Sequence, residues 1–174
     1  LAGCAMSVSG LVMQLLTQNR FVEPTTTGTT EWAALGLLVV VIVFPDASLP
    51  VRMIAASVAA FSGAMILLGI LQRIALRSSL VVPLIGIMLG AVVSAFTTYL
   101  AVTTNMLQML GTWFMGSFTS VVRGRYEVLW IVAIIVVVVY LFADRLTVAG
   151  LGKDVATSLG VRYERVLLLG TALV

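Results

Sequence analysis

Long apolar segments alternate with short polar connectors along the whole chain. The apolar runs cover residues 1–17, 32–44, 52–71, 80–104, 128–142 and the end of the chain from Val166 on. A helix needs about 20 residues to cross a bilayer, so the third and fourth runs are long enough, whereas 32–44 is short. The run 128–142 is rich in Val and Ile, but a strand in lipid would leave backbone groups unpaired, so a helix is expected. The pattern predicts an all-α, polytopic transmembrane helical bundle.

The most distinctive connector is LGKDVATSLGVRYERV, residues 151–166, which is polar and lies between two apolar runs. Val155 and Leu159 are four residues apart, which indicates a short helix from about Lys153 to Leu159. Gly160 stands where a left-handed residue would end that helix. A connector this polar must lie outside the lipid, and an ordinary solvated loop remains an alternative to the helix.

Small residues recur every four positions in the run 80–104, at Gly86, Gly90, Ser94 and Thr98. Small residues at this spacing let helix backbones approach one another closely in membranes. The spacing alone leaves two interpretations open, generic packing within one subunit and a specific role.

The remaining connectors carry local predictions. Residues 18–30, QNRFVEPTTTGTT, form a polar loop broken by Pro24 and Gly28. Glu31 then begins the next helix, and Trp32 is expected at the membrane interface. Residues 106–110 form a short interfacial helix, a turn follows at 111–114, and the polar residues 144–145 end the run 128–142.

Composition strengthens the membrane interpretation. The 174 residues are 61% hydrophobic and 10% charged, with a mean hydropathy of +1.17, whereas soluble domains average about 25% charged residues. The chain starts at Leu1 without a signal-peptide pattern and stops at Val174 inside an apolar run, so we interpret it as the central fragment of a longer protein. The single Cys4 and the absence of His predict no disulfide, no His-based catalysis and no metal site or cofactor.

The basic residues predict an orientation. One set of alternate connectors, at 18–31, 72–79 and 144–165, carries seven Lys and Arg residues: Arg20, Arg73, Arg77, Arg145, Lys153, Arg162 and Arg165. The other set carries three: Arg52, Arg123 and Arg125. The positive-inside rule places the first set in the cytoplasm. Topology thus accounts for the net charge of +3, and nucleic-acid binding is not expected.

The sequence contains no catalytic constellation and no phosphate-binding G-x-x-x-x-G-K-[ST] loop. The middles of the predicted spans also lack Asp, Glu, Lys and Arg. Ion-coupled carriers usually need ionisable groups at membrane depth, so this absence argues that energy arrives from a separate subunit.

Three blocks resemble one known family. The pattern L-G-x-x-x-A-x-x-L-G resembles the coupling segment of the iron–siderophore and vitamin B12 class of ABC importer permeases; it is formed by Leu151, Gly152, Ala156, Leu159 and Gly160. The family block Q-x-x-x-x-N-P-L-A-x-P-x-x-x-G is matched by Gln14, Asn19, Glu23, Pro24 and Gly28, and its W-x-x-G turn by Trp113, Met115 and Gly116. The chain departs from the family at Arg20, Phe21, Val22, Glu31 and Trp32.

The resemblance implies one fold and one function. The fold would be the B12-importer permease type, with about five to six of about ten spans present, so that residues 1–174 are part of a single transmembrane permease domain and 144–165 a cytoplasmic coupling segment. The function would be a permease subunit, not itself an enzyme, of an ABC importer that moves ferric siderophore across the cytoplasmic membrane of a bacterium. The alternatives are a secondary transporter or channel without an ATPase partner, and an ABC permease for B12 or heme.

The same resemblance implies partners and sites. The partners would be an ATPase subunit, a soluble or lipoprotein substrate-binding protein, a second permease subunit and membrane lipid. The residues expected to couple to the ATPase are Leu151, Gly152, Lys153, Val155, Ala156, Leu159 and Gly160. The candidates for the pathway and its gate are Ser78, Ser79, Gly86, Gly90, Ser94 and Thr98, and those for docking of the binding protein are Arg123 and Arg125.

Overall fold

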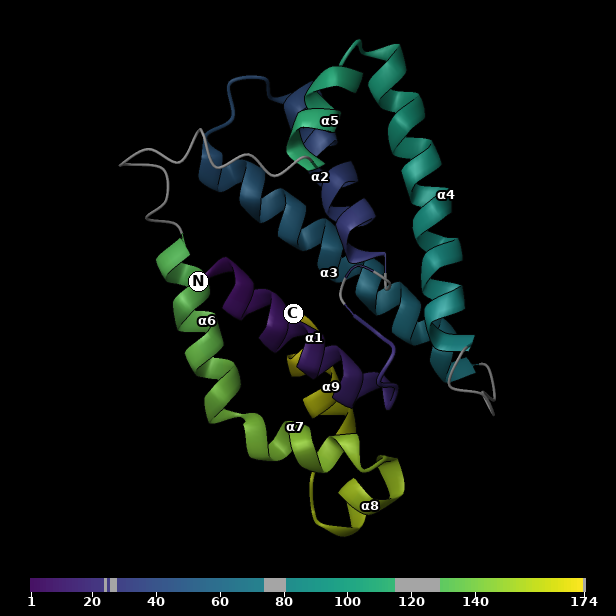
Figure 1. Ribbon diagram of the computed structural model, residues 1–174, viewed down its shortest axis with the longest axis vertical. Coiled ribbons are helices and arrows are strands. Elements are labelled where there is room, and N and C mark those ends of the chain that lie inside the picture. Colours follow the sequence, from purple (N-terminus) through teal and green to yellow (C-terminus); the bar gives the residue numbers. More distant parts are fainter. Residues whose placement is uncertain (24, 26–27, 74–80, 115–128, 174) are drawn as a thin grey trace.

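The computed structural model describes residues 1–23, 25, 28–73, 81–114 and 129–173, and its regular elements within these ranges are helices (Figure 1). In chain order they are α1 (Ala2–Thr17), α2 (Thr29–Val43), α3 (Leu49–Arg73), α4 (Val81–Thr103), α5 (Leu107–Phe114), α6 (Leu129–Leu141), α7 (Ala143–Gly150), α8 (Lys153–Ser158) and α9 (Tyr163–Leu173). The all-α prediction is confirmed.

Two of these helices are long and apolar enough to cross a membrane unaided, over Leu49–Ile70 and Leu84–Thr103. The pair α6 and α7 passes the same test together but is bent by 60°. The helices α1 and α2 are apolar but shorter. The short run after residue 30 therefore does form a short helix, as its length indicated.

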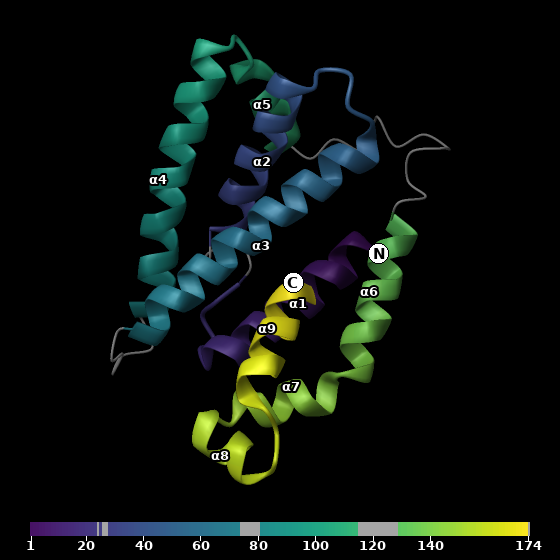
Figure 2. The ribbon, with the colours of Figure 1, turned by 180° about the vertical axis from the view of Figure 1, so that it is seen from behind.

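The helices pack in two groups. In one group α2 lies against both α3 and α4, and in the other α1 lies against α6, α7 and α9 (Figures 1 and 2). Contacts between α3 and α9 connect the groups. The short helix α8 lies at the lower end of the molecule in both views, next to α7 and α9.

Small residues bring α2 and α3 together. A Cβ added to Gly36 of α2 would lie 2.5 Å from the Cβ of Ala59 and 2.7 Å from the carbonyl oxygen of Ala55. The indole of Trp32 occupies the space that a side chain at Gly63 would need. Gly63 lies inside α3, so Trp32 packs on a neighbouring helix at a glycine that leaves room for its ring.

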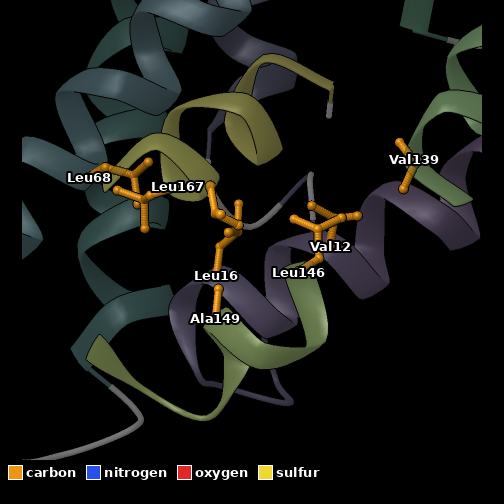
Figure 3. Packing of buried hydrophobic residues seen from close by; sticks show 8 residues of the cluster. Val12, Leu16, Leu68, Val139, Leu146, Ala149 and Leu167 are labelled. Carbon is orange, nitrogen blue, oxygen red and sulfur yellow. The ribbon is translucent and has the colours of Figure 1, made fainter. Parts of the chain in front are cut away.

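A hydrophobic cluster holds the second group together. Its buried members are Val12, Leu16, Leu68, Val139, Leu146, Ala149, Val166 and Leu167, from α1, α3, α6, α7 and α9. Figure 3 shows Leu16 between Leu167 and Ala149, and Val12 next to Leu146. Close packing of this kind fixes α7 and α9, the two helices that flank α8.

One local prediction is wrong, because residues 111–114 belong to α5 and not to a turn. The fifth run ends where expected, since α6 stops at Leu141. After a break at Phe142, however, Asp144 and Arg145 form the first turn of a further helix, α7, which was not predicted. The pair Leu146 and Ala149, three residues apart and both buried, provides the apolar face that supports this additional helix.

Candidate coupling helix and membrane-depth cavity

The connector 151–166 contains the predicted helix, α8, and the loop alternative is excluded. Gly152 precedes the helix with φ 106° and ψ 161°, a region of backbone space that is essentially restricted to glycine. Gly160 follows it with φ 77°, so the predicted left-handed glycine is confirmed. The Gly160 N–H donates to the carbonyl oxygen of Thr157 at 3.0 Å, and the Val161 N–H to that of Ala156 at 2.9 Å. These two bonds form a Schellman motif, which satisfies carbonyls at the helix end.

The apolar residues of this segment divide into an exposed and a buried set. Leu151, Val155 and Leu159 are 60%, 44% and 60% exposed and follow one another at four-residue spacing. Ala156 is 0% exposed, so it packs within the chain and is not available as a contact residue for a partner. This burial corrects the expectation that Ala156 supplies docking surface: its small size lets α8 pack closely on its own support.

The helix α8 contacts α7 and α9, and the residues just before it pack on α1. A Cβ at Gly150, the last residue of α7, would lie 2.8 Å from a methyl group of Leu15. A Cβ at Gly152 would lie 3.3 Å from the Nε2 atom of Gln18, the left-handed residue that ends α1. The exposed face of α8 is therefore carried on a base that is closely packed on its other side.

A second constellation lies where α2 begins. Gly28, the residue directly before α2, lies against the N-terminal half of α4. Gly28, with φ 78°, packs there on α4: its added Cβ would lie 3.2 Å from Cα of Gly90 and 3.3 Å from the carbonyl oxygen of Gly86. Two of the four small residues in the α4 stripe are thus covered by the loop in front of α2.

Glu31 follows in the first turn of α2 and points toward the same part of α4. Its carboxylate lies next to Gly90, with Oε2 3.4 Å from an added Cβ. That oxygen is buried and has no hydrogen-bond partner among the described residues. Gly90 is well inside the apolar span Leu84–Thr103, so Glu31 places a carboxylate beside that span although the residue itself lies outside the predicted run 32–44. From the sequence, Glu31 was expected at the polar end of a helix, because it lies in the first turn of α2. In the structure that first turn packs against α4.

A cavity of about 260 Å³ adjoins this carboxylate. Glu31, Ser94, Thr97 and Thr98 supply its polar lining. The Thr97 hydroxyl donates to the carbonyl oxygen of Val93 at 2.8 Å, while Ser94 and Thr98 are exposed. The structure thus brings Ser94 and Thr98, the last two residues of the predicted stripe, together with the carboxylate of Glu31. Glu31 was not among the predicted site residues. The one signal for it in the sequence was that Glu31 departs from the family pattern.

The family block in the loop after α1 has a structural role of its own. Asn19 is 3% exposed, and its Oδ1 atom accepts a hydrogen bond of 2.9 Å from the backbone N–H of Phe21. This bond closes a local turn directly after α1. Among the other predicted residues, Trp113 lies in α5, whereas Ser78, Ser79, Arg123 and Arg125 lie outside the described residues, together with Pro24, Met115 and Gly116.

These features define a class of protein: a helical bundle with apolar helices long enough to span a membrane and a short helix displayed at one end. The chain belongs to the FecCD transport family, whose pattern matches residues 1–174. The resemblance inferred from the three sequence blocks is therefore confirmed.

Two curated relatives are siderophore permeases by name. The chain is 56% identical over 174 residues to the petrobactin import system permease protein FatD of Bacillus anthracis, covering 100% of this chain and 52% of the relative. It is 40% identical over 174 residues to the petrobactin import system permease protein YclN of Bacillus subtilis (strain 168), covering 100% of this chain and 55% of the relative. The chain thus spans about half the length of the curated relatives it matches.

A solved structure supports the fold. It is a metal-chelate type ABC transporter in an inward-facing conformation, with a TM-score of 0.75 and 24% sequence identity; the match covers 98% of this chain and 55% of that chain. At this identity the likeness is evidence for the fold alone.

Proposed function

We propose that this chain is part of the permease subunit of an ABC importer that moves a ferric siderophore across the cytoplasmic membrane of a bacterium. The observation that carries the proposal is the match to the FecCD transport family over the whole chain, together with 56% identity to a petrobactin import permease. A separate subunit hydrolyses ATP, a binding protein delivers cargo, and a second permease subunit completes the pathway. Residues 1–174 form part of one transmembrane domain.

Energy transfer is assigned to residues 144–165, on the cytoplasmic side, with α8 as the contacting helix. The support for this assignment is that Val155 in α8 is exposed together with Leu151 before the helix and Leu159 after it, and that a glycine stands at each end of the helix. Lys153 is exposed beside this face and is available to an acidic partner surface. Ala156, Gly152 and Gly160 contribute indirectly, because they set the position of the helix.

The test is a charge placed on the exposed face in the full-length transporter. Leu159→Asp puts an unpaired carboxylate into the proposed contact, and the amount of ATPase subunit that co-purifies should fall about tenfold or more. Thr157→Asp is the matched control, because Thr157 is also exposed in α8 but outside this stripe. Co-purification that is equal for both variants would remove the coupling assignment. A wild-type protein that transports without any ATPase subunit would favour a secondary transporter or channel.

The pathway is assigned to the side of α4 that carries Ser94 and Thr98, next to Glu31. Small hydroxyl side chains leave room for a bulky chelate, and Gly86 and Gly90 allow Gly28 to hold α2 close enough to form the cavity. Ser78 and Ser79 would then lie near the cytoplasmic gate.

Cysteine labelling tests this pathway in a Cys4→Ser background, because Cys4 is exposed and would react itself. Cysteines at 94 and 98 should react with a membrane-impermeant polar thiol reagent, and the reaction should slow when cargo is added. Val92→Cys is the control, since Val92 is 68% exposed on α4 and is expected to face lipid. Labelling of all three cysteines only by lipid-soluble reagents would exclude a pathway on this side.

Cargo and binding-protein docking need separate measurements. Uptake of a ferric siderophore, B12 and heme by the same full-length transporter distinguishes the proposed cargo from the two alternatives. Arg123 and Arg125 are proposed to attract acidic residues of the binding protein, an interaction that mainly steers association and is screened by salt. Unchanged binding-protein affinity at low salt for Arg123→Glu combined with Arg125→Glu would rule this role out.

A further inference from the structure

A pocket of about 400 Å³ opens between α7, α9 and the end of α6, apart from the exposed face of α8. Three arginines line it, Arg145, Arg162 and Arg165, and no acidic residue does. The rest of the lining is apolar apart from two glycines, and it includes Phe142, Leu169 and Leu173. A pocket with this composition favours a ligand that is both anionic and apolar.

The guanidinium groups are available to such a ligand. All three arginines are exposed, and in the part of the chain that the structure describes none of them forms an ion pair. Arg145 instead lies over the ring of Phe142, 5.7 Å from its centroid. That contact leaves the edge of the guanidinium free to donate hydrogen bonds, which suits the oxygens of a phosphate group.

Charge and apolarity are separated along the pocket. Arg162 directly precedes α9 and Arg165 lies in its first turn, whereas Leu169 and Leu173 lie about one and two turns beyond Arg165. From Arg165 to Leu173 the helix rises about 12 Å. Leu169 is 49% exposed, so the apolar part remains open to the surroundings. Figure 2 shows α9 standing beside α6, with α7 crossing beneath them.

We propose that this pocket binds an anionic phospholipid of the cytoplasmic leaflet. Its phosphate group lies among the three arginines, and one acyl chain lies along α9 against Leu169 and Leu173. Basic pockets between membrane helices on the cytoplasmic side are the type of site that anionic headgroups occupy. Since Gly160 and Val161 also border the pocket, the lipid touches the segment that connects α8 to the bundle.

The experiment uses the full-length transporter, reconstituted in phosphatidylcholine nanodiscs in which about one lipid in ten is deuterated phosphatidylglycerol, an anionic lipid. Bound phosphatidylglycerol is counted by native mass spectrometry after release into detergent. Arg162→Gln combined with Arg165→Gln should lower its retention roughly 25-fold. The control with the same change in charge combines Arg20→Gln and Lys153→Gln, two exposed cations outside the pocket, and should retain it.

Three results would overturn the proposal. Equal loss in both double variants would mean general attraction of the membrane surface to basic residues. Full retention in both would mean that the rest of the protein fills the pocket. Normal lipid retention with loss of the ATPase subunit in the first variant would identify an acidic protein surface as the occupant. If the double variant is not recovered in the membrane, Arg145→Gln tests the same site with a single exposed change.

Discussion

The two glycines that bound α8 predict different responses to the same substitution. Alanine at Gly160 meets no atom within 4 Å, so only its backbone at φ 77° is strained, which costs about 1 kcal/mol. Alanine at Gly152 must adopt φ 106° and ψ 161°, which costs about 2 kcal/mol. Its Cβ also lies 3.3 Å from the side chain of Gln18. Local opening of α8 should therefore increase about 5-fold for Gly160→Ala and about 25-fold for Gly152→Ala.

Hydrogen exchange of the α8 amides in the full-length transporter measures this opening, with the α7 amides as internal reference. Asparagine provides the decisive comparison, because it tolerates the left-handed region around Gly160 but gains nothing in the region of Gly152. Gly160→Asn should recover most of the protection that Gly160→Ala loses, and Gly152→Asn should not. Equal protection in the two asparagine variants would refute the assignment of these effects to backbone conformation.

Three further substitutions test the packing of the first helix group and its loop by thermal unfolding of the detergent-solubilised transporter. Gly28→Ala should lower the midpoint clearly, because its Cβ would meet Gly90 at 3.2 Å and its φ is 78°; an unchanged midpoint would mean that the loop in front of α2 does not hold α4. Gly63→Ala should be destabilising alone but much less so with Trp32→Ala, because the indole occupies the space of the added methyl group; simple additivity would argue against that contact. Asn19→Ala should cost about 1 kcal/mol, whereas Asn19→Asp retains the acceptor and should cost less.

Sequence reasoning was most successful where the signal was local. The position of α8, the left-handed Gly160 and the approximate bounds of α3 and α4 follow from apolar runs and from glycine placement, which depend on neighbouring residues. The family assignment likewise depended on three short blocks.

Sequence reasoning failed where depth in the bundle decided the outcome. Glu31 and Trp32 follow a polar loop, and nothing local indicates that Gly28 packs on Gly86 and Gly90 of α4 directly before the helix begins. The burial of Ala156 was also hidden, because it shares the apolar character of Val155 and Leu159 and only the supporting helices distinguish them. The helix α7 was missed because charged residues at 144–145 resemble the end of a span.

The 60° bend between α6 and α7 determines how a load on α8 reaches the bundle. The eight residues of α7 extend about 12 Å, so the bend displaces α8 sideways from the axis of α6 by roughly 10 Å. A force directed along α6 but applied at α8 therefore exerts a torque on the Phe142 junction instead of pure compression. The hydrophobic cluster includes Val139 on the α6 side of that junction and Leu146 and Ala149 on the α7 side. The cluster can therefore carry this torque into α1, so that the corner acts as a lever with a short, rigid arm.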